Sequence, residues 1–234
     1  MADLPILFSA PMVRALIAGT KTQTRRIVKP QPTASGSVKL GDDKIDAAEW
    51  QIREGRFIKV NVGDRFWVRE TLKADKMENI LTGERDTNAT VAYYAADDAE
   101  VLEKNGFNVA WGWKRPSVPS IHMPRAVSRI TLIVEDVKVE RLQDISEADA
   151  IAEGIEPVYD ERSPGKTFWK DYECYPDKIP HAHAVVPFVL PSRSYCSLWE
   201  EINGHGSWID NPWVAAYTFR RIMGNIDHIE GGDA

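Results

Sequence analysis

Residues 128–142 form the strongest strand-forming region of this sequence, because they are rich in Val and Ile. β-branched side chains are restricted in a helix and fit the pleated surface of a strand. A strand of this length can bend across a small barrel. A short helix is expected to follow it. Ser146 is the N-cap residue of this helix, with Asp149 three residues later, and the helix ends at Gly154. The sequence therefore predicts a mixed α+β fold.

Weaker patterns supply the remaining elements, and Gly and Pro separate them. Residues 73–88 are charged and are predicted to be a loop or a short helix. The predicted strands are 5–9, 22–28, 64–71, 89–95 and 213–222, and the predicted helices are 10–18, 97–105 and 192–203. At 234 residues, one domain over 1–223 is expected. Two insertions, near 33–59 and 156–191, and a flexible tail over 224–234 complete this prediction.

The segment from Gly19 to Arg26 concentrates cations and hydroxyl groups next to a largely apolar stretch. The expected helix ends at Gly19, and alternation along the following strand places Thr22, Thr24 and Arg26 on one face. A segment with these cations and hydroxyl groups suits an anionic or carbonyl-bearing ligand. The structural alternative is a solvated turn that enters a strand.

Charge is unevenly distributed along the chain. Residues 1–30 carry a net charge of +4 in a chain of −6, so the remainder carries −10. A local basic site on an acidic body favours contact with one nucleotide over long tracking of a nucleic-acid backbone. No apolar run is long enough to span a bilayer and the first residues do not resemble a signal peptide, so we expect a cytoplasmic protein without a membrane partner.

Two cysteines give no disulfide framework. Cys174, His181, His183 and Cys196 lie near one another in sequence, but their spacing matches no zinc pattern. The sequence therefore predicts no metal site, and it leaves the oligomeric state open.

Four blocks in this order resemble the ASCH family, a branch of the PUA-like β-barrels. The first is the spacing Gly-x-Lys-x-x-x-x-Arg at Gly19, Lys21 and Arg26. The others are the runs 62–70, 142–154 and 211–219. Together they cover about half of the chain and are similar to longer members found in phages and prophages. The resemblance implies a PUA-like β-barrel with short flanking helices.

The resemblance also implies an activity, since one compact ASCH enzyme is an amidohydrolase that removes the acetyl group from N4-acetylcytidine. By this resemblance Lys21 would activate Thr24, Thr24 would attack the amide carbonyl, and Glu153 would protonate the leaving N4. Arg26 would steady the substrate or the intermediate. The residues Arg25, Thr22 and Glu70 complete the expected substrate-binding set, and no cofactor is implied.

Each of these residues also has a structural role available. Thr24 suits a strand, Glu153 suits a solvated helix face, and Lys21 suits a position near a helix end. Glu70 could pair with a neighbouring arginine. The compact amidohydrolases are about half this length, and insertions can close or redirect a cleft.

Two further functions stay open. The first is non-catalytic binding of RNA or a modified base, in which tryptophans near turns would stack on bases: Trp111, Trp113, Trp208 and Trp213. Trp67 and Trp199 lie within predicted elements and are expected in the core. The second is ribonuclease activity at the same cationic segment, Gly19 to Arg26. The sequence offers no cluster of metal-binding carboxylates for this activity.

Overall fold

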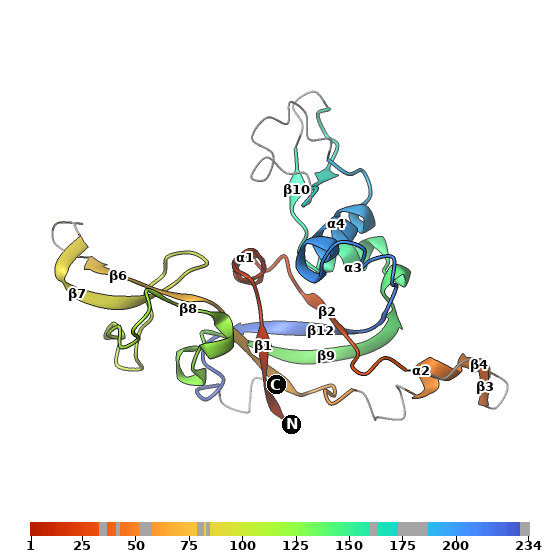
Figure 1. Cartoon of the computed structure of the whole chain (residues 1–234), viewed down its shortest axis with the longest axis horizontal. Helices are drawn as coiled ribbons and strands as arrows, with labels where there is room; N and C mark the ends of the chain where they lie inside the picture. Colours follow the sequence, from red (N-terminus) through yellow and green to blue (C-terminus); the bar gives the residue numbers. More distant parts are fainter. Residues whose placement is uncertain are drawn as a thin grey trace. The chain divides into compact units, whose positions relative to one another are not determined.

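The structure, a computed structural model, describes residues 1–32, 37–40, 43–51, 58–78, 82, 85–159, 163–172 and 187–229. Its contacts divide the chain into two compact units, each built from segments that are distant in sequence. Unit 1 contains Met1–Gly19, Gly63–Val134 and Arg220–Ala234, and unit 2 contains Thr20–Val62 and Glu135–Phe219. Helices and strands mix along the chain (Figure 1), which confirms the α+β class.

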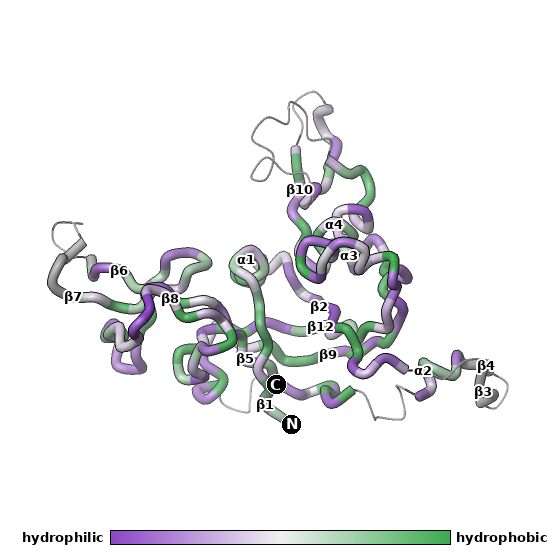
Figure 2. The backbone as a smooth tube through the Cα atoms, viewed as in Figure 1, coloured by the Kyte–Doolittle hydropathy of each residue, from purple (hydrophilic) through white to green (hydrophobic). Residues whose placement is uncertain are grey.

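The main sheet has five strands in the order β1-β5-β9-β12-β2. Its members are β1 (Asp3–Leu7), β5 (Arg65–Arg69), β9 (Ile130–Arg141), β12 (Trp213–Met223) and β2 (Gln23–Ile27). β1 runs parallel to β5, while β5 is antiparallel to β9 and β12 is antiparallel to β2. β9 begins with mostly hydrophobic residues (Figure 2). These strands confirm the predictions for 128–142 and 22–28, and the unit boundaries fall inside β9 and β12.

The predicted closed barrel is wrong for the part of the chain that the structure describes. β1 and β2 stand at the two ends of the sheet order, each with a single paired strand. Closure of a barrel requires hydrogen bonds between the two end strands. Both end strands have only five residues, and Pro5 in β1 lacks an amide hydrogen, which suits an edge position. The sheet is therefore open.

Helix α1 (Ala10–Ala18) has the predicted bounds. Pro11 lies in its first turn, where a missing amide hydrogen costs nothing. Gly19 ends the helix with a φ of 79°, in the left-handed region that glycine adopts without strain. Arg221 donates to the carbonyl oxygens of Leu16 and Ile17 at this end. The helix therefore ends where the signature segment begins.

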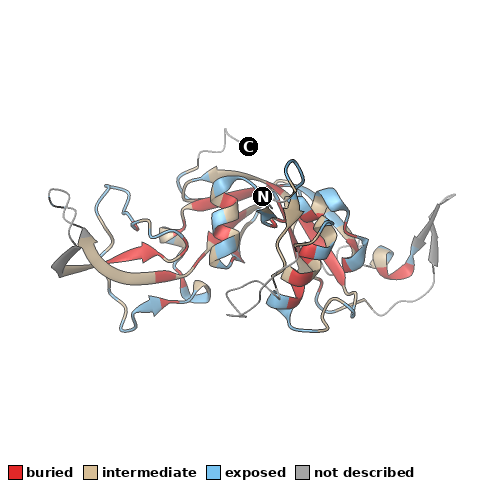
Figure 3. Ribbon diagram, turned by 90° about the horizontal axis from the view of Figure 1, so that it is seen from above, coloured by how far each residue is buried: buried red, intermediate tan, exposed pale blue. Residues whose placement is uncertain are grey.

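The other helices are α2 (Ala47–Gln51), α3 (Glu147–Ala152) and α4 (Pro191–Asn203). The Ser146 side chain accepts from the Asp149 amide at 3.1 Å, so the predicted cap of α3 is confirmed. Gly154 follows with a φ of 84°. In Figure 3 the helices carry buried residues on one side and exposed residues on the other. Within the described residues, no helix combines the length and apolar character needed to cross a bilayer.

Unit 1 carries a second sheet in the order β7-β6-β8, formed by β6 (Leu72–Glu78), β7 (Arg85–Tyr94) and β8 (Ser117–Val118). The loop or short helix predicted for 73–88 is therefore wrong, because pairing with β7 determines the conformation of β6. The helix predicted for 97–105 is also wrong. Asp98 has a φ of 61°, and bridges join Tyr93 to Glu100 and Leu102 to Asn108.

The predicted insertions contain short hairpins. In the described part of 33–59, β3 (Ser37–Leu40) pairs antiparallel with β4 (Asp43–Asp46) and α2 follows. In the described part of 156–191, β10 (Pro157–Val158) pairs antiparallel with β11 (Phe168–Trp169). Cys174, His181 and His183 lie outside the described residues. The single-domain prediction itself stays a prediction.

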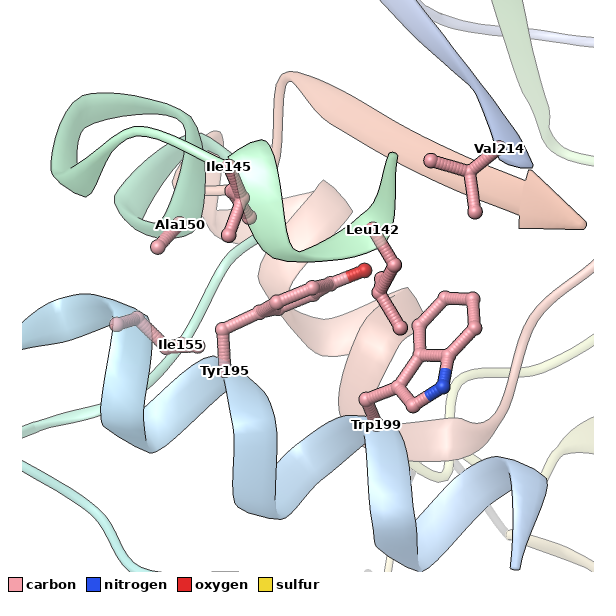
Figure 4. Packing of buried hydrophobic residues seen from close by; sticks show 7 residues of the cluster. All are labelled: Leu142, Ile145, Ala150, Ile155, Tyr195, Trp199 and Val214. Atoms are coloured by element: carbon pink, nitrogen blue, oxygen red, sulfur yellow. The ribbon is translucent and has the colours of Figure 1, made fainter. Parts of the chain in front are cut away.

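Each unit has its own apolar cluster. The cluster of unit 2 joins α3 and α4 to Leu142, which follows β9, and to Val214 near the start of β12. In Figure 4 Tyr195 and Trp199 project from α4 toward Leu142. The cluster of unit 1 lies around the second sheet, with Leu72, Val118 and Met123 almost fully buried. Trp67 and Trp199 are buried as predicted. Trp213 is buried too, so the prediction of a surface stacking position there is wrong.

The chain after β12 differs from the predicted flexible tail up to residue 229. The Gly224 amide donates to the Arg129 carbonyl oxygen at 2.8 Å, and Ile226 is only 1% exposed. Asn225 Nδ2 donates to three carbonyl oxygens of residues 125–128. These contacts fix residues 224–229, and residues 230–234 lie outside the described part.

Candidate active site

Lys21 lies three residues after the last residue of α1 and has no exposed side-chain surface. Its Nζ donates to Oε2 of Glu153 at 2.8 Å and to the backbone oxygen of Glu153 at 2.7 Å. The next residue also contacts the C-terminal end of α3, because the Thr22 amide donates to the Ala152 oxygen at 2.8 Å. Residues that are 132 positions apart are thus in direct contact.

Glu153 is the C-cap residue of α3, and its side chain is 2% exposed. Its second carboxylate oxygen, Oε1, accepts from Arg25 at 3.1 Å. The carboxylate therefore bridges two buried cations. This burial differs from the solvated helix position that the sequence left as an alternative.

The Arg25 side chain is also fully buried within unit 2. Its Nε and NH2 donate to Oε1 of Glu140 at 3.1 and 2.6 Å, and its NH1 donates to Gln23 at 2.6 Å. Tyr195 places its ring 5.9 Å from the guanidinium carbon. All three guanidinium nitrogens thus bind protein groups, which makes Arg25 a buried anchor rather than an exposed substrate contact.

Two further carboxylates complete what we call the buried ion network: Lys21, Arg25, Glu140, Asp149 and Glu153. Arg25 NH2 lies 3.4 Å from Asp149 Oδ2. Lys138 Nζ lies 2.6 Å from Glu140 Oε2, in ion-pair contact without hydrogen-bond geometry. The Lys138 side chain is 51% exposed, so the network meets solvent at that lysine.

Burial dominates the electrostatics of Lys21. It lowers the pKa of the amine below the ordinary value of 10.5, and it outweighs the charge and hydrogen bond of Glu153, which act to raise that pKa. The positive charges of Arg26 and Arg25 lower it further. Lys21 is therefore closer to a neutral amine than an exposed lysine is, which is the state required of a base.

The phenol of Tyr195 stays protonated beside this pair. Burial raises the pKa of Tyr195 well above 10, and the negative charge of Glu153 raises it further. Tyr195 is thus a neutral hydrogen-bonding group that adds no charge to the site. It comes from α4 and also belongs to the apolar cluster of unit 2.

Thr24 and Arg26 lie on the opposite face of β2 from Arg25, because successive side chains alternate. Thr24 is buried and is the register partner of Tyr217 on β12. Arg26 is half-buried. Burial lowers the pKa of Arg26, against the opposing effects of Glu153 and two tyrosines, so this guanidinium interacts electrostatically with the Glu153 carboxylate.

The predicted residues are only partly brought together. The contacts of the described residues join Lys21 to Glu153, but they include no hydrogen bond to the Thr24 hydroxyl. Catalytic hydrogen bonds are often long before substrate binds. Thr22 is exposed, and its carbonyl oxygen accepts from the Phe219 amide at 3.0 Å.

Glu70 belongs to unit 1, whereas the buried ion network belongs to unit 2. Arg129 donates to both Glu70 carboxylate oxygens, at 2.9 and 2.8 Å, and it also binds Asp97. Burial raises the pKa of Glu70, and the hydrogen bond and charge of Arg129 oppose that shift. These contacts match the structural ion pair rather than a substrate contact.

The sequence prediction missed Glu140 and Tyr195. Alternation along β9 places Glu140 on the same face as Lys138, and helical spacing on α4 places Tyr195 beside Trp199. Both patterns are present in the sequence, but neither identifies Arg25 as the partner of Glu140 and Tyr195. Such pairings depend on contacts between distant segments.

In the described part of the chain, no group of three or more His, Cys, Asp or Glu side chains could hold a metal ion. The chemistry available at the buried ion network is proton transfer between a lysine and a carboxylate. Comparison of the chain with models of known families, with curated proteins and with solved structures finds no match in any of the three.

Proposed function

We propose that this chain is an ASCH-type amidohydrolase that removes the acyl group from N4-acetylcytidine or a related modified nucleoside, and that its main sheet is an open form of the PUA-like barrel. The observation that carries the proposal is the buried Lys21–Glu153 pair, with 2.8 Å between Nζ and Oε2. A buried ion pair adds little stability, because desolvation offsets the attraction. Strongly perturbed ionisable groups with a specific partner are typical of functional sites.

The pair can hold one mobile proton in two ways. In the ion-pair form Lys21 is an ammonium and Glu153 a carboxylate. Transfer of the proton across the hydrogen bond gives a neutral amine and a carboxylic acid. Burial lowers the pKa of Lys21, and this acts in the direction of the neutral amine. The neutral form supplies a base and an acid together.

The first half-reaction uses that neutral form. The Lys21 amine takes the proton of the Thr24 hydroxyl, and Thr24 Oγ1 attacks the amide carbonyl carbon. The C–N4 bond then breaks as Glu153 donates its proton to N4. Cytidine leaves, Thr24 carries the acyl group, and the pair is left in its ion-pair form.

The second half-reaction restores the starting state. Water attacks the acyl carbon and gives a proton to the Glu153 carboxylate, while the Lys21 ammonium returns a proton to Thr24 Oγ1. The products are the carboxylic acid and free Thr24. Arg26 shares a face of β2 with Thr24, and its charge stabilises the oxyanion of both tetrahedral intermediates.

Purified protein mixed with N4-acetylcytidine, without added metal, tests this proposal. Cytidine and acetate are expected in equal amounts, measured by chromatography. N4-acetylcytidine and an N4-alkylated cytidine should differ completely, since only the first has a carbonyl carbon to attack. A folded protein that leaves every N4-acylated cytidine intact would favour the non-catalytic binding alternative.

The pH dependence follows from the lowered pKa of Lys21. The pair acts while it holds one mobile proton, so kcat/KM is expected to fall as the pH rises through a pKa below 10.5, where that proton is lost. In that interval the unfolded chain binds more protons at this lysine than the folded chain, so the free energy of unfolding rises with pH while kcat/KM falls. A Lys21→Arg variant stays protonated throughout, so its residual turnover should lack this falling limb. A falling limb of unchanged position in that variant would assign the titrating group to another residue.

A further inference from the structure

A cavity of about 290 Å³ opens beside β8 in unit 1. We call it the basic pocket, and its lining residues are Trp113, Lys114, Arg115, Ser117, Val118, Pro119 and His122. Val118 is buried, while the lysine and the arginine are exposed. The pocket thus combines an apolar floor and an aromatic wall with a cationic rim.

The wall of the basic pocket is held in place by the second sheet. The Trp111 amide donates to the Thr90 oxygen at 3.0 Å, and Trp111 Nε1 donates to the Arg115 oxygen at 3.0 Å. The rings of Trp111 and Trp113 lie 4.8 Å apart between centroids. A ligand therefore meets an aromatic surface that is already ordered, which reduces the entropic cost of binding.

The charge around the basic pocket is of one sign. Residues 104–134 contain five Lys and Arg residues and no Asp or Glu, within a chain of net charge −6. Arg125 and Arg129 form ion pairs with carboxylates of other segments. Among the residues that the structure describes, Lys114 and Arg115 have no carboxylate within ion-pair distance. Both side chains are exposed, so an anionic ligand can reach them.

The size of the basic pocket limits its occupant. Small-molecule sites usually measure about 300–1,000 Å³, so this cavity lies at the small end. It has room for one planar ring rather than an extended chain. Aromatic side chains beside cationic ones are the recurring means of holding a base and its phosphate.

We propose that the basic pocket binds one nucleotide, whose base stacks on Trp113 and whose phosphate pairs with Lys114 and Arg115. The nucleotide can be free or part of a single strand, since both present the same base and phosphate. This site goes beyond the amidohydrolase activity and does not rest on it. Its test is direct binding without turnover, so that either conclusion can fail alone.

Titration of the full chain with adenosine monophosphate, adenosine and inorganic phosphate, followed by tryptophan fluorescence, tests the proposal. The monophosphate is expected to bind more tightly than either of the other two, and its affinity should fall between about 50 and about 200 mM salt. A fluorescein-labelled single strand of about eight adenylates distinguishes a free nucleotide from a nucleotide within a single strand. Tighter binding of the strand indicates nucleic acid, and equal binding indicates a free nucleotide.

Three variants assign the binding to this pocket. Trp113→Ala is expected to weaken the monophosphate about tenfold to a hundredfold, and Trp113→Phe should retain part of the affinity. Lys114→Ala should weaken binding and reduce its salt dependence, whereas Lys104→Ala removes the same charge outside the lining and should change little. Thermal melts check that each variant is folded. Binding that is absent, no tighter than phosphate alone, or unchanged in Trp113→Ala would overturn the proposal.

Discussion

Replacing Glu153 by glutamine is expected to lower kcat/KM for N4-acetylcytidine by about 10²–10⁴-fold, the range for losing a positioned acid–base group. Glutamine has nearly the same shape, and its amide oxygen can still accept from Lys21. It cannot take the proton that the neutral form of the pair requires. The measurement is steady-state turnover, together with a thermal melt that confirms folding.

Glu70→Gln is the matched control, since it makes the same chemical change at a buried carboxylate of unit 1. It removes a charged partner of Arg129 and is expected to lower the melting temperature while turnover continues. A folded but inactive Glu70→Gln protein beside an active Glu153→Gln protein would place the acid at Glu70.

A double variant sharpens the test of the pair. If Lys21 and Glu153 share one proton, Lys21→Met combined with Glu153→Gln should lose about as much activity as either single change. Two independent roles would instead give losses that multiply. The comparison uses kcat/KM measured at one pH for all four proteins.

Replacing Arg25 by methionine is expected to give the largest loss of stability, about 3–5 kcal/mol in the free energy of unfolding. Methionine fills similar space, but Glu140 loses both hydrogen bonds from Arg25 and Glu153 loses one. Buried carboxylates without a cation are strongly unfavourable. Chemical denaturation monitored by circular dichroism measures the change.

Lys138→Met is the matched control for Arg25→Met, because it removes a cation from the solvent side of the same carboxylate. Its exposure limits the expected loss to about 1 kcal/mol or less. Equal losses in the two variants would contradict the assignment of Arg25 as the buried anchor.

Local signals in the sequence predicted the elements around the site. Ser146 and Gly154 delimit α3, Gly19 ends α1, and the β-branched residues of 128–142 form β9. Each of these signals acts within a few residues of its own position. The position of Lys21 beside a helix end was therefore within reach of the sequence.

Long-range pairing was not predictable in the same way. The charges in residues 73–88 predicted a loop or a short helix, yet residues 72–78 form β6 because β7 pairs with them. Closure of a barrel depends on whether end strands meet, which no local pattern records. Similarly, the family resemblance assigned Lys21 and Glu153 to one site, while the Arg25–Glu140 contact spans 115 positions and carried no sequence signal.

The acyl group on Thr24 gives the most direct test of the central claim. Wild-type protein is mixed with N4-acetylcytidine, quenched in acid within the first turnover, and analysed by mass spectrometry of the intact chain and its peptides. One acetyl group is expected, located on Thr24, and Thr24→Ala should carry none and release no cytidine. An acetyl group on Lys21, or wild-type turnover by Thr24→Ala, would contradict the mechanism.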